Sequence, residues 1–300
     1  MISTPKALVL LDGSDRSLNT VDYICHVPMF QSMRIVLYYV FSNVPEGYWD
    51  LQKEPSSIRA YNELRAWEKH KREEIEAYME YSRRRLSKAG FSRDAIEIKI
   101  QNRQKGIARD ILEEARAGYE VLVLRRRGMG QLEGMSMGSV ATKILTKLTF
   151  LPLQVAGRKD WNNKILIGVD GSPHAAQTVD FVSKHIGSGD YCVCLVHVIR
   201  GFGNVNAENF KFMVSEKDVE AAKEDIQKHF GQLKEKLVTA GVKPENVTDK
   251  IITGSYSRAG SLVKEADCGN FSTIVLGRRG HSVVKEFFMG RVCQKVVQAG

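Results

Sequence analysis

Two Asp-Gly-Ser sequences follow short apolar runs, and each leads into a helical pattern. Their carboxylates, Asp12 and Asp170, are candidate ligand-binding groups, because open α/β sheets bind ligands beyond the carboxyl ends of their strands. A structural alternative exists, since Asp or Ser before a helix commonly caps its first turn. Ser14 and Ser172 would cap their helices in either case.

Glycine-containing loops follow a later apolar run in each half. Glycine lets the backbone approach a bound group closely, and a helix N-terminus offers free N–H groups to an anion. The pattern therefore predicts phosphate binding, and its occurrence in both halves strengthens a signal that is weak when found once. The candidate loop residues are Gly128, Gly138, Ser139, Gly277, Gly280, Gly290 and Arg291.

Arginines occupy both loops. They are Arg125, Arg126 and Arg127 in the first half and Arg278 and Arg279 in the second. Beside a phosphate, each charged hydrogen bond would contribute about 1.5–3 kcal/mol. In a solvated turn the same side chains would contribute little, and they could also hold another anion.

The loops belong to an internal repeat. Residues 6–14 recur as residues 164–172, and residues 123–128 recur as residues 275–280. The offset between the two copies is not constant, as expected when a loop or helix differs in length between copies of one domain. The sequence therefore predicts a tandem duplication.

Within each half, short β-branched runs alternate with helical patterns. Strand-like runs that are apolar on both faces indicate parallel strands buried between two helical layers. We predict an α/β fold made of two tandem, open, doubly wound parallel sheets of the Rossmann-like kind. In the first half we expect strands near 6–11, 34–40, 95–100, 120–124 and 150–156, and helices near 17–25, 57–89, 107–117 and from 138.

A polar stretch separates the copies. We predict a first domain over residues 1–157, a linker over 158–163 and a second domain over 164–300. The apolar run 150–156 closes the first half but has no counterpart in the second. Either the sequence given stops short of that strand, or the second domain borrows or lacks its edge strand.

The strand-end aspartates, the strand-end valines Val40 and Val198, the glycine loops and the order of elements resemble the ATP-binding branch of the universal stress protein family. The resemblance covers nearly the whole chain and extends to the adenine nucleotide α-hydrolase-like fold. It implies that Asp12 and Asp170 contact the adenosine portion of a nucleotide and that the backbones of Val40 and Val198 contact adenine. It also implies that the glycine loops, with the hydroxyl of Ser139, hold the ribose and the phosphates.

Each loop departs from the family pattern at one position. Arg125 stands where the first glycine belongs, and it places a long side chain where close backbone approach is expected. Arg291 stands where Ser or Thr belongs, so a hydroxyl is replaced by a guanidinium that can bind phosphate bidentately. The cofactor that the resemblance implies is ATP or AMP, which Mg²⁺ could accompany.

Composition and charge limit which cellular compartment and which binding partners we expect. Five cysteines, two of them at Cys192 and Cys194 in one apolar run, do not form a disulfide framework or a metal site. With no signal peptide and no run long enough to span a membrane, we expect a cytoplasmic protein. The loop arginines explain part of the formal charge of +9, so we predict an adenine nucleotide rather than nucleic acid as the partner, and a homodimer.

No catalytic motif accompanies the nucleotide pattern. The sequence contains no Gly-x-x-x-x-Gly-Lys-Ser/Thr loop, nucleophile elbow or His-Glu-x-x-His motif, so any ATP hydrolysis is expected to be slow. The leading hypothesis is a nucleotide-binding stress-response protein that acts as a regulatory or signalling module. The alternatives are a nucleotide-free interaction scaffold with degenerate loops and an enzyme of the related adenine-nucleotide hydrolase fold group.

Overall fold

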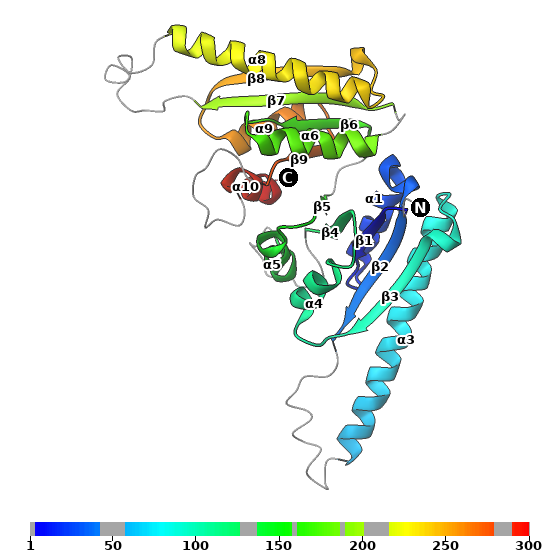
Figure 1. Ribbon diagram of the computed structural model, residues 1–300. Helices are drawn as coiled ribbons and strands as arrows, with labels where there is room; N and C mark the ends of the chain where they lie inside the picture. Colours follow the sequence, from blue (N-terminus) through cyan, green and yellow to red (C-terminus); the bar gives the residue numbers. More distant parts are fainter. Residues whose placement is uncertain are drawn as a thin grey trace. The chain divides into compact units, whose positions relative to one another are not determined.

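The computed structural model describes residues 4–42, 58–126, 137–157, 161–186, 190–200, 216–278 and 290–299. The chain divides into two compact units, Met1–Arg158 and Lys159–Gly300. In each unit, parallel strands alternate with helices along the chain (Figure 1). The predicted duplicated, doubly wound α/β architecture is confirmed.

Within its described residues, the first unit has a five-stranded parallel sheet with the order β3-β2-β1-β4-β5. Its strands are β1 (Lys6–Leu10), β2 (Arg34–Phe41), β3 (Ile96–Asn102), β4 (Val121–Arg125) and β5 (Leu153–Ala156). Its helices are α1 (Asp15–His26), α3 (Ile58–Lys88), α4 (Ile107–Glu114) and α5 (Ser139–Lys147), with short 3-10 turns at Pro28–Ser32 and Arg93–Ala95. The N-terminal part of α3 extends past the ends of the strands (Figure 1).

The part of the second unit that the structure describes has a four-stranded parallel sheet with the order β8-β7-β6-β9. Its strands are β6 (Lys164–Gly168), β7 (Cys192–Arg200), β8 (Val247–Ser255) and β9 (Thr273–Leu276). Its helices are α6 (Pro173–Ile186), α8 (Glu216–Thr239), α9 (Arg258–Cys268) and α10 (Arg291–Ala299), with a 3-10 turn at Pro244–Asn246. A counterpart of β5 is not present among these residues.

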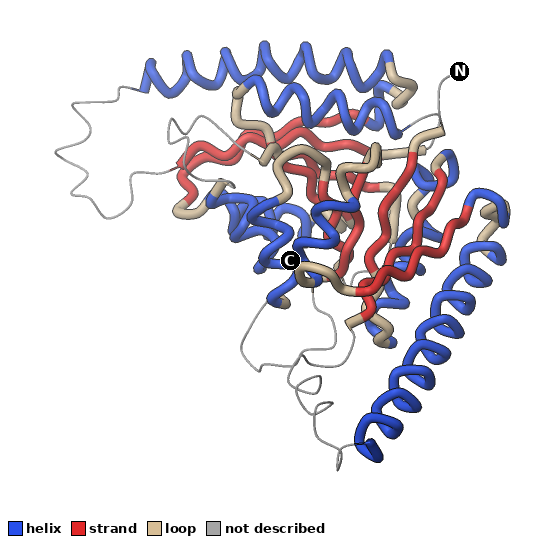
Figure 2. Tube along the Cα trace, turned by 60° about the horizontal axis from the view of Figure 1, so that its bottom comes forward, coloured by secondary structure: helices blue, strands red, loops and turns tan. Residues whose placement is uncertain are grey.

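Helices cover both faces of each sheet, as the helices and strands of Figure 2 show. In the second unit, Ile165 and Ile167 of β6 pack with α6 and α8, whereas Leu166 between them packs with α9 and α10. Successive strand residues point to opposite faces. Because both faces are buried, the strands are apolar along their length, which is the pattern that predicted parallel strands.

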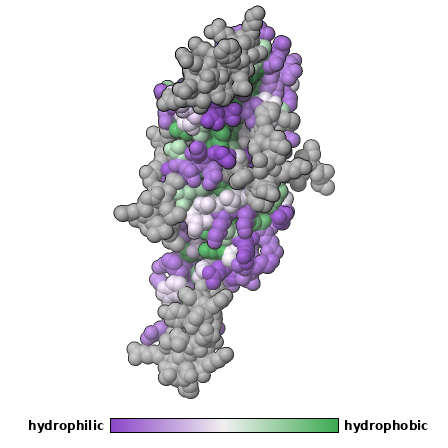
Figure 3. Space-filling view, turned by 90° about the vertical axis from the view of Figure 1, so that its left-hand side faces the viewer, coloured by the Kyte–Doolittle hydropathy of each residue, from purple (hydrophilic) through white to green (hydrophobic). Residues whose placement is uncertain are grey.

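The large hydrophobic side chains that the described residues expose lie on different elements. Trp67 and Tyr81 belong to α3 and Val238 to α8, while Phe150 and Tyr256 lie in connections. Over the face shown in Figure 3, hydrophobic surface alternates with hydrophilic side chains. None of the helices in the described part of the chain is long and apolar enough to cross a membrane.

Asn162, which the sequence places in the linker, is bonded to the second unit. Its amide Nδ2 donates to the carbonyl of Asn270 at 2.8 Å, and its Oδ1 accepts from the N–H of Lys164 at 3.0 Å. Its own carbonyl accepts from the Ser272 hydroxyl at 2.6 Å. These bonds join the C-terminal part of the predicted linker to the start of β6 and to the residues that precede β9.

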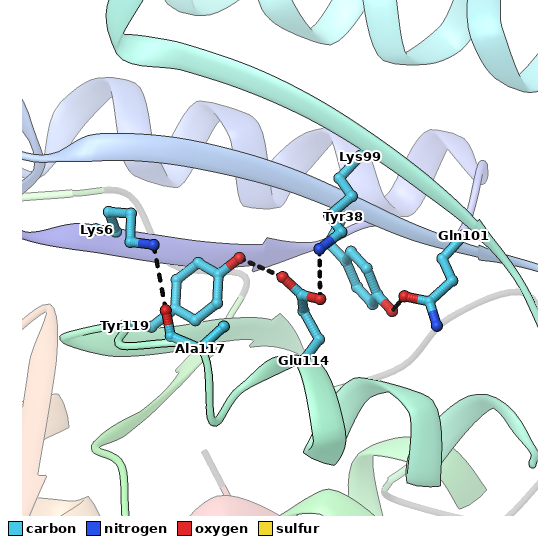
Figure 4. Close-up of polar contacts among 7 residues, drawn as sticks. All are labelled: Lys6, Tyr38, Lys99, Gln101, Glu114, Ala117 and Tyr119. Carbon is cyan, nitrogen blue, oxygen red and sulfur yellow. Dashed lines mark hydrogen bonds and ion pairs between the residues drawn. The ribbon is translucent and has the colours of Figure 1, made fainter.

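A buried carboxylate fixes α4 against the sheet of the first unit (Figure 4). The Glu114 side chain is 8% exposed, and its Oε2 lies 2.6 Å from Lys99 Nζ of β3. Its Oε1 accepts from the Tyr119 hydroxyl at 2.5 Å. Burial, together with this bond to Glu114, raises the pKa of Tyr119 well above its usual range, so the hydroxyl stays protonated and donates.

The second unit repeats this ion pair. Lys250 Nζ of β8 lies 2.8 Å and 2.7 Å from the two carboxylate oxygens of Glu265 on α9. Removing one partner of a largely buried ion pair destabilises the fold, because the other partner is left as an uncompensated charge. The pair therefore ties the C-terminal part of each helix to the sheet.

Candidate functional site

Each sheet has a point at which the chain crosses from one side of the first strand to the other. In the first unit β1 is flanked by β2 and β4, and in the second unit β6 is flanked by β7 and β9. Connections that leave such neighbouring strands run to opposite faces and leave a crevice, where doubly wound sheets bind ligands. The carboxyl ends of β1 and β4, and of β6 and β9, are therefore the candidate sites.

In the first unit, an aspartate and an arginine follow the ends of the two strands that flank this crevice. Val9 of β1 pairs with Val123 of β4, and Asp12 and Arg126 each lie three residues further on. Burial, with a further contribution from the charge of Asp12, raises the pKa of Tyr39 on β2. The charge of Asp12 thus acts on a residue of the neighbouring strand.

The second unit has the same register. Ile167 of β6 pairs with Val275 of β9, and Asp170 and Arg278 each lie three residues further on. Burial raises the pKa of the Cys293 thiol to about 11, with Arg278 lowering it and Asp170 raising it further. Both charges thus act on one buried group, whose thiol lies at the end of β9.

Asp12 braces the turn that begins α1. Its Oδ1 accepts from the N–H and the hydroxyl of Ser14, at 3.1 Å and 2.6 Å. Ser14 Oγ in turn accepts from the N–H of Ser17 at 3.2 Å and caps the helix. The Ser17 hydroxyl lies 2.6 Å from the hydroxyl of Tyr78 on α3, which ties the turn to that helix.

The second unit builds the same turn. Asp170 Oδ1 accepts from the N–H of Ser172 at 3.1 Å, and the buried Ser172 hydroxyl accepts from the N–H of Ala175 at 3.3 Å. The capping role predicted for both serines is confirmed. A carboxylate has two acceptor oxygens, so bracing the turn through Oδ1 is compatible with a ligand contact.

The glycine of this turn is required by its backbone. Gly13 has φ +79, and a Cβ built on it would lie 2.7 Å from Ile75 Cδ1. We expect Gly13→Ala to lower the free energy of unfolding by about 1–3 kcal/mol, measured by chemical denaturation. Gly231→Ala in α8 is the control, because a Cβ there meets nothing within 4 Å; equal losses in the two variants would contradict the account.

One backbone bond closes each glycine loop at the crevice. The N–H of Gly138 donates to the carbonyl of Arg126 at 3.0 Å, and the N–H of Gly290 donates to the carbonyl of Arg278 at 2.9 Å. The same bond therefore forms at equivalent positions of the two units. A Cβ on Gly290 would lie 3.2 Å from the Arg278 carbonyl oxygen, so a side chain there would crowd the closure.

The closing bonds place two helix N-termini at the crevices. Ser139 is the first residue of α5 and Arg291 the first residue of α10, and both side chains are exposed. The first N–H groups of a helix lack helical acceptors and favour an anion. Two further predicted residues, Gly128 and Gly280, lie outside the described residues.

The strand-end valines place a backbone carbonyl at each crevice. The Tyr38 carbonyl of β2 accepts from the N–H of Leu11 at 3.0 Å, after which the chain leaves β1 and turns into α1. Strand carbonyls alternate in direction, so the next one on this side is that of Val40. Val198 stands in the same relation to Val196 on β7, and both valine side chains are buried.

Arg125, expected to crowd the first loop, reaches toward α1 and the end of β5. Its Nη1 donates to the carbonyl of Gly157 at 3.5 Å. The Asn19 amide oxygen, in the orientation that satisfies its hydrogen bonds, accepts from both terminal nitrogens at 3.1 Å and 3.2 Å. The departure from glycine is thus accommodated by the helix and strand beside the loop.

Sequence reasoning missed two residues of the second crevice. The Cys293 thiol donates to the carbonyl of Gly277 at 3.0 Å, directly at the end of β9. Arg258, the first residue of α9, donates from Nε to the carbonyl of Val198 at 3.4 Å. Comparing the first residues of equivalent helices would have singled out Arg258, because the first residue of α4 is Ile107.

Comparison with family models gives two matches. Residues 4–150 and 162–299 each match the model of the universal stress protein family. No curated protein sequence matches the chain. The two matched segments correspond to the two units and include every candidate site residue.

Solved structures match either both units or about half of the chain. A universal stress protein from Archaeoglobus fulgidus is 17% identical, with a TM-score of 0.64, and the match covers 99% of this chain and 96% of that one. A candidate universal stress protein from Pseudomonas aeruginosa is 13% identical, with a TM-score of 0.58 and coverage of 99% and 90%. A universal stress protein in complex with cAMP is 15% identical, with a TM-score of 0.34, over 45% of this chain and 89% of that one.

Proposed function

The chain belongs to the universal stress protein family, and from this premise we propose that it is a regulatory protein that holds ATP or AMP in a strand-end crevice. The phosphates bind the first N–H groups of α5 or α10, with Ser139 or Arg291 beside them. The adenosine portion lies toward Asp12 or Asp170. Mg²⁺ could accompany the phosphates.

One observation carries this proposal: the loop-closing bond recurs in both units. The bonds of Gly138 to Arg126 and of Gly290 to Arg278 hold the loop ends together. Each bond ties the start of a helix to the end of β4 or β9, the strand paired with the one that precedes Asp12 or Asp170, and this supports the proposal. A helix N-terminus has a partial positive charge that favours phosphates, and a carboxylate accepts hydrogen bonds from hydroxyl or amino groups. The pair suits a ligand with phosphates at one end and such donors at the other.

We propose that occupancy, rather than turnover, is the signal. A nucleotide shifts a protein between two states only when it binds them with different affinities. The described crevice residues supply hydrogen bonds and charge but no recognised nucleophile and base pair. We further propose that the protein acts in the cytoplasm and as a homodimer, since edge strands of open sheets offer surfaces for self-association.

Calorimetry with ATP and with AMP tests the proposal on the full chain. We expect dissociation constants in the micromolar to submillimolar range, and a melting temperature that rises with nucleotide. At a ligand concentration of about 100 times the dissociation constant, binding stabilises the folded state by about 2.7 kcal/mol. An absence of both heat and thermal shift would exclude nucleotide binding and leave the scaffold.

The nucleotide-free interaction scaffold is the second candidate, and one contact favours it for the second unit. There, the Arg258 guanidinium already contacts the Val198 carbonyl, which the resemblance assigns to adenine. A unit in which Arg258 bonds the Val198 carbonyl would contact other proteins rather than recognise a nucleotide.

A further inference from the structure

Among the described residues, the two crevices differ in whether a side chain bonds one backbone acceptor. In each unit, β2 or β7 extends beyond the end of its neighbour, β1 or β6. The first carbonyl of this extension that lies on the side of β1 or β6 points toward the crevice. It belongs to Val40 in the first unit and to Val198 in the second. A carbonyl oxygen is an acceptor only, so at this position it selects a ligand that carries an N–H or O–H donor.

In the second unit a side chain of the protein supplies that donor. Arg258 Nε donates to the Val198 carbonyl at 3.4 Å. Arg258 is the first residue of α9, directly after the capping residue Ser257. The equivalent position of the first unit, the first residue of α4 after its N-cap glycine, is Ile107, whose side chain has no donor.

A base amino group that enters the second crevice must therefore displace the guanidinium or remain unpaired. An unpaired polar group in a binding site costs about 10- to 100-fold in affinity. Displacing Arg258 also moves a cation whose helix is fixed over the sheet by the Lys250–Glu265 pair. Either route penalises the same ligand that the Val40 carbonyl would accept.

We propose that Arg258 makes the two units unequal: it closes the second crevice to the adenine base, so that the chain binds a single adenine nucleotide, in the first unit. Arg258 is a specificity-determining residue in this scheme. The inference rests on the proposed nucleotide site and adds which unit fills it and why. The residue at the first position of α4 or α9 decides whether the valine carbonyl accepts a hydrogen bond from the protein's own side chain.

Exchanging the two helix-start residues tests the inference, with ATP stoichiometry on the full chain measured by calorimetry. The unaltered chain is expected to bind one ATP. Arg258→Ile gives the second unit the side chain of the first and is expected to raise the number to two. Ile107→Arg gives the first unit the side chain of the second and is expected to weaken ATP binding by about 10-fold or more.

Lys264→Ile is the control, because it removes one positive charge from an exposed position of the same helix. It should leave one ATP bound, and matching melting temperatures should show that the variants fold. Two ATP bound by the unaltered chain, or one ATP still bound by Arg258→Ile, would overturn the inference and leave nucleotide binding intact. Lack of ATP binding by all of these proteins would overturn the proposed function and the inference together.

Discussion

Replacing Gly138 and Gly290 with glutamate is expected to abolish ATP binding, with a loss of about 100-fold or more in affinity. Each substitution puts a carboxylate at the N-terminus of α5 or α10, where the phosphates are proposed to bind. Two like charges about 4 Å apart repel by about 4 kcal/mol at an effective dielectric constant near 20. That energy exceeds the roughly 2.7 kcal/mol of a 100-fold change in affinity.

The fold should survive the substitution at Gly138, and matching melting temperatures check it at Gly290, where a Cβ would lie 3.2 Å from the Arg278 carbonyl oxygen. Gly138 has φ −69 and ψ 153, an extended conformation open to any residue, and an acidic side chain at a helix N-terminus is favourable in the absence of a bound anion. Gly231→Glu in α8 adds the same charge at an open position and should bind ATP normally. Retained affinity in the double variant would show that these helix ends are not the phosphate site.

The single variants Gly138→Glu and Gly290→Glu test whether the two units differ in ATP binding. If only the first unit binds ATP, Gly138→Glu alone should remove binding and Gly290→Glu alone should leave it unchanged. Both loops are closed by the same backbone bond, so a difference between the variants has to come from residues around the loops rather than from the loops themselves.

Phe230→Ala is expected to destabilise the second unit by about 3–5 kcal/mol. Phe230 is fully buried on α8, where it packs with β6, β7 and α6 in one core cluster. Truncation removes the transfer free energy of the ring and leaves a cavity that close-packed neighbours fill only in part. Chemical denaturation with a probe in the second unit measures the change.

Val238→Ala is the matched comparison for this prediction. Val238 lies on the same helix but is 37% exposed, so its truncation should cost within about 1 kcal/mol. Similar losses for Phe230→Ala and Val238→Ala would mean that the α8 face carrying Phe230 does not form the core of the second unit.

The fold was predictable because its signals are local and repeated. Buried parallel strands are apolar on both faces, and each predicted run of the first half overlaps a strand. The ends agree within one or two residues, except that the run 150–156 begins three residues before β5. The predicted resemblance to the universal stress protein family is confirmed by two family matches. Helix ends were less accurate: the helix expected over 107–117 ends at Glu114, since the residues beyond it form turns that no capping signal marks.

The site was only partly predictable, because its pairings depend on register. The sequence indicated Asp12, Gly138 and their second-half counterparts as separate strand-end features. That Asp12 and Arg126 follow the ends of neighbouring strands depends on the pairing of β1 with β4, which residue types do not encode. Likewise, the path of Arg125 toward Gly157 depends on where β5 ends, and the contact of Arg258 with Val198 depends on how α9 lies over β7.

The closing bonds of the two loops also bear on how such a duplicated protein can diverge. The segments 127–137 and 279–289 lie between the bonded residues and have equal length, although the two halves differ in length elsewhere. Each closing bond joins main-chain atoms, so it does not depend on the side chains of the segment between its two ends. Substitutions inside the tethered segments can therefore accumulate over evolutionary time while the helix that follows keeps its position, so each copy can acquire a new ligand preference without rebuilding its scaffold.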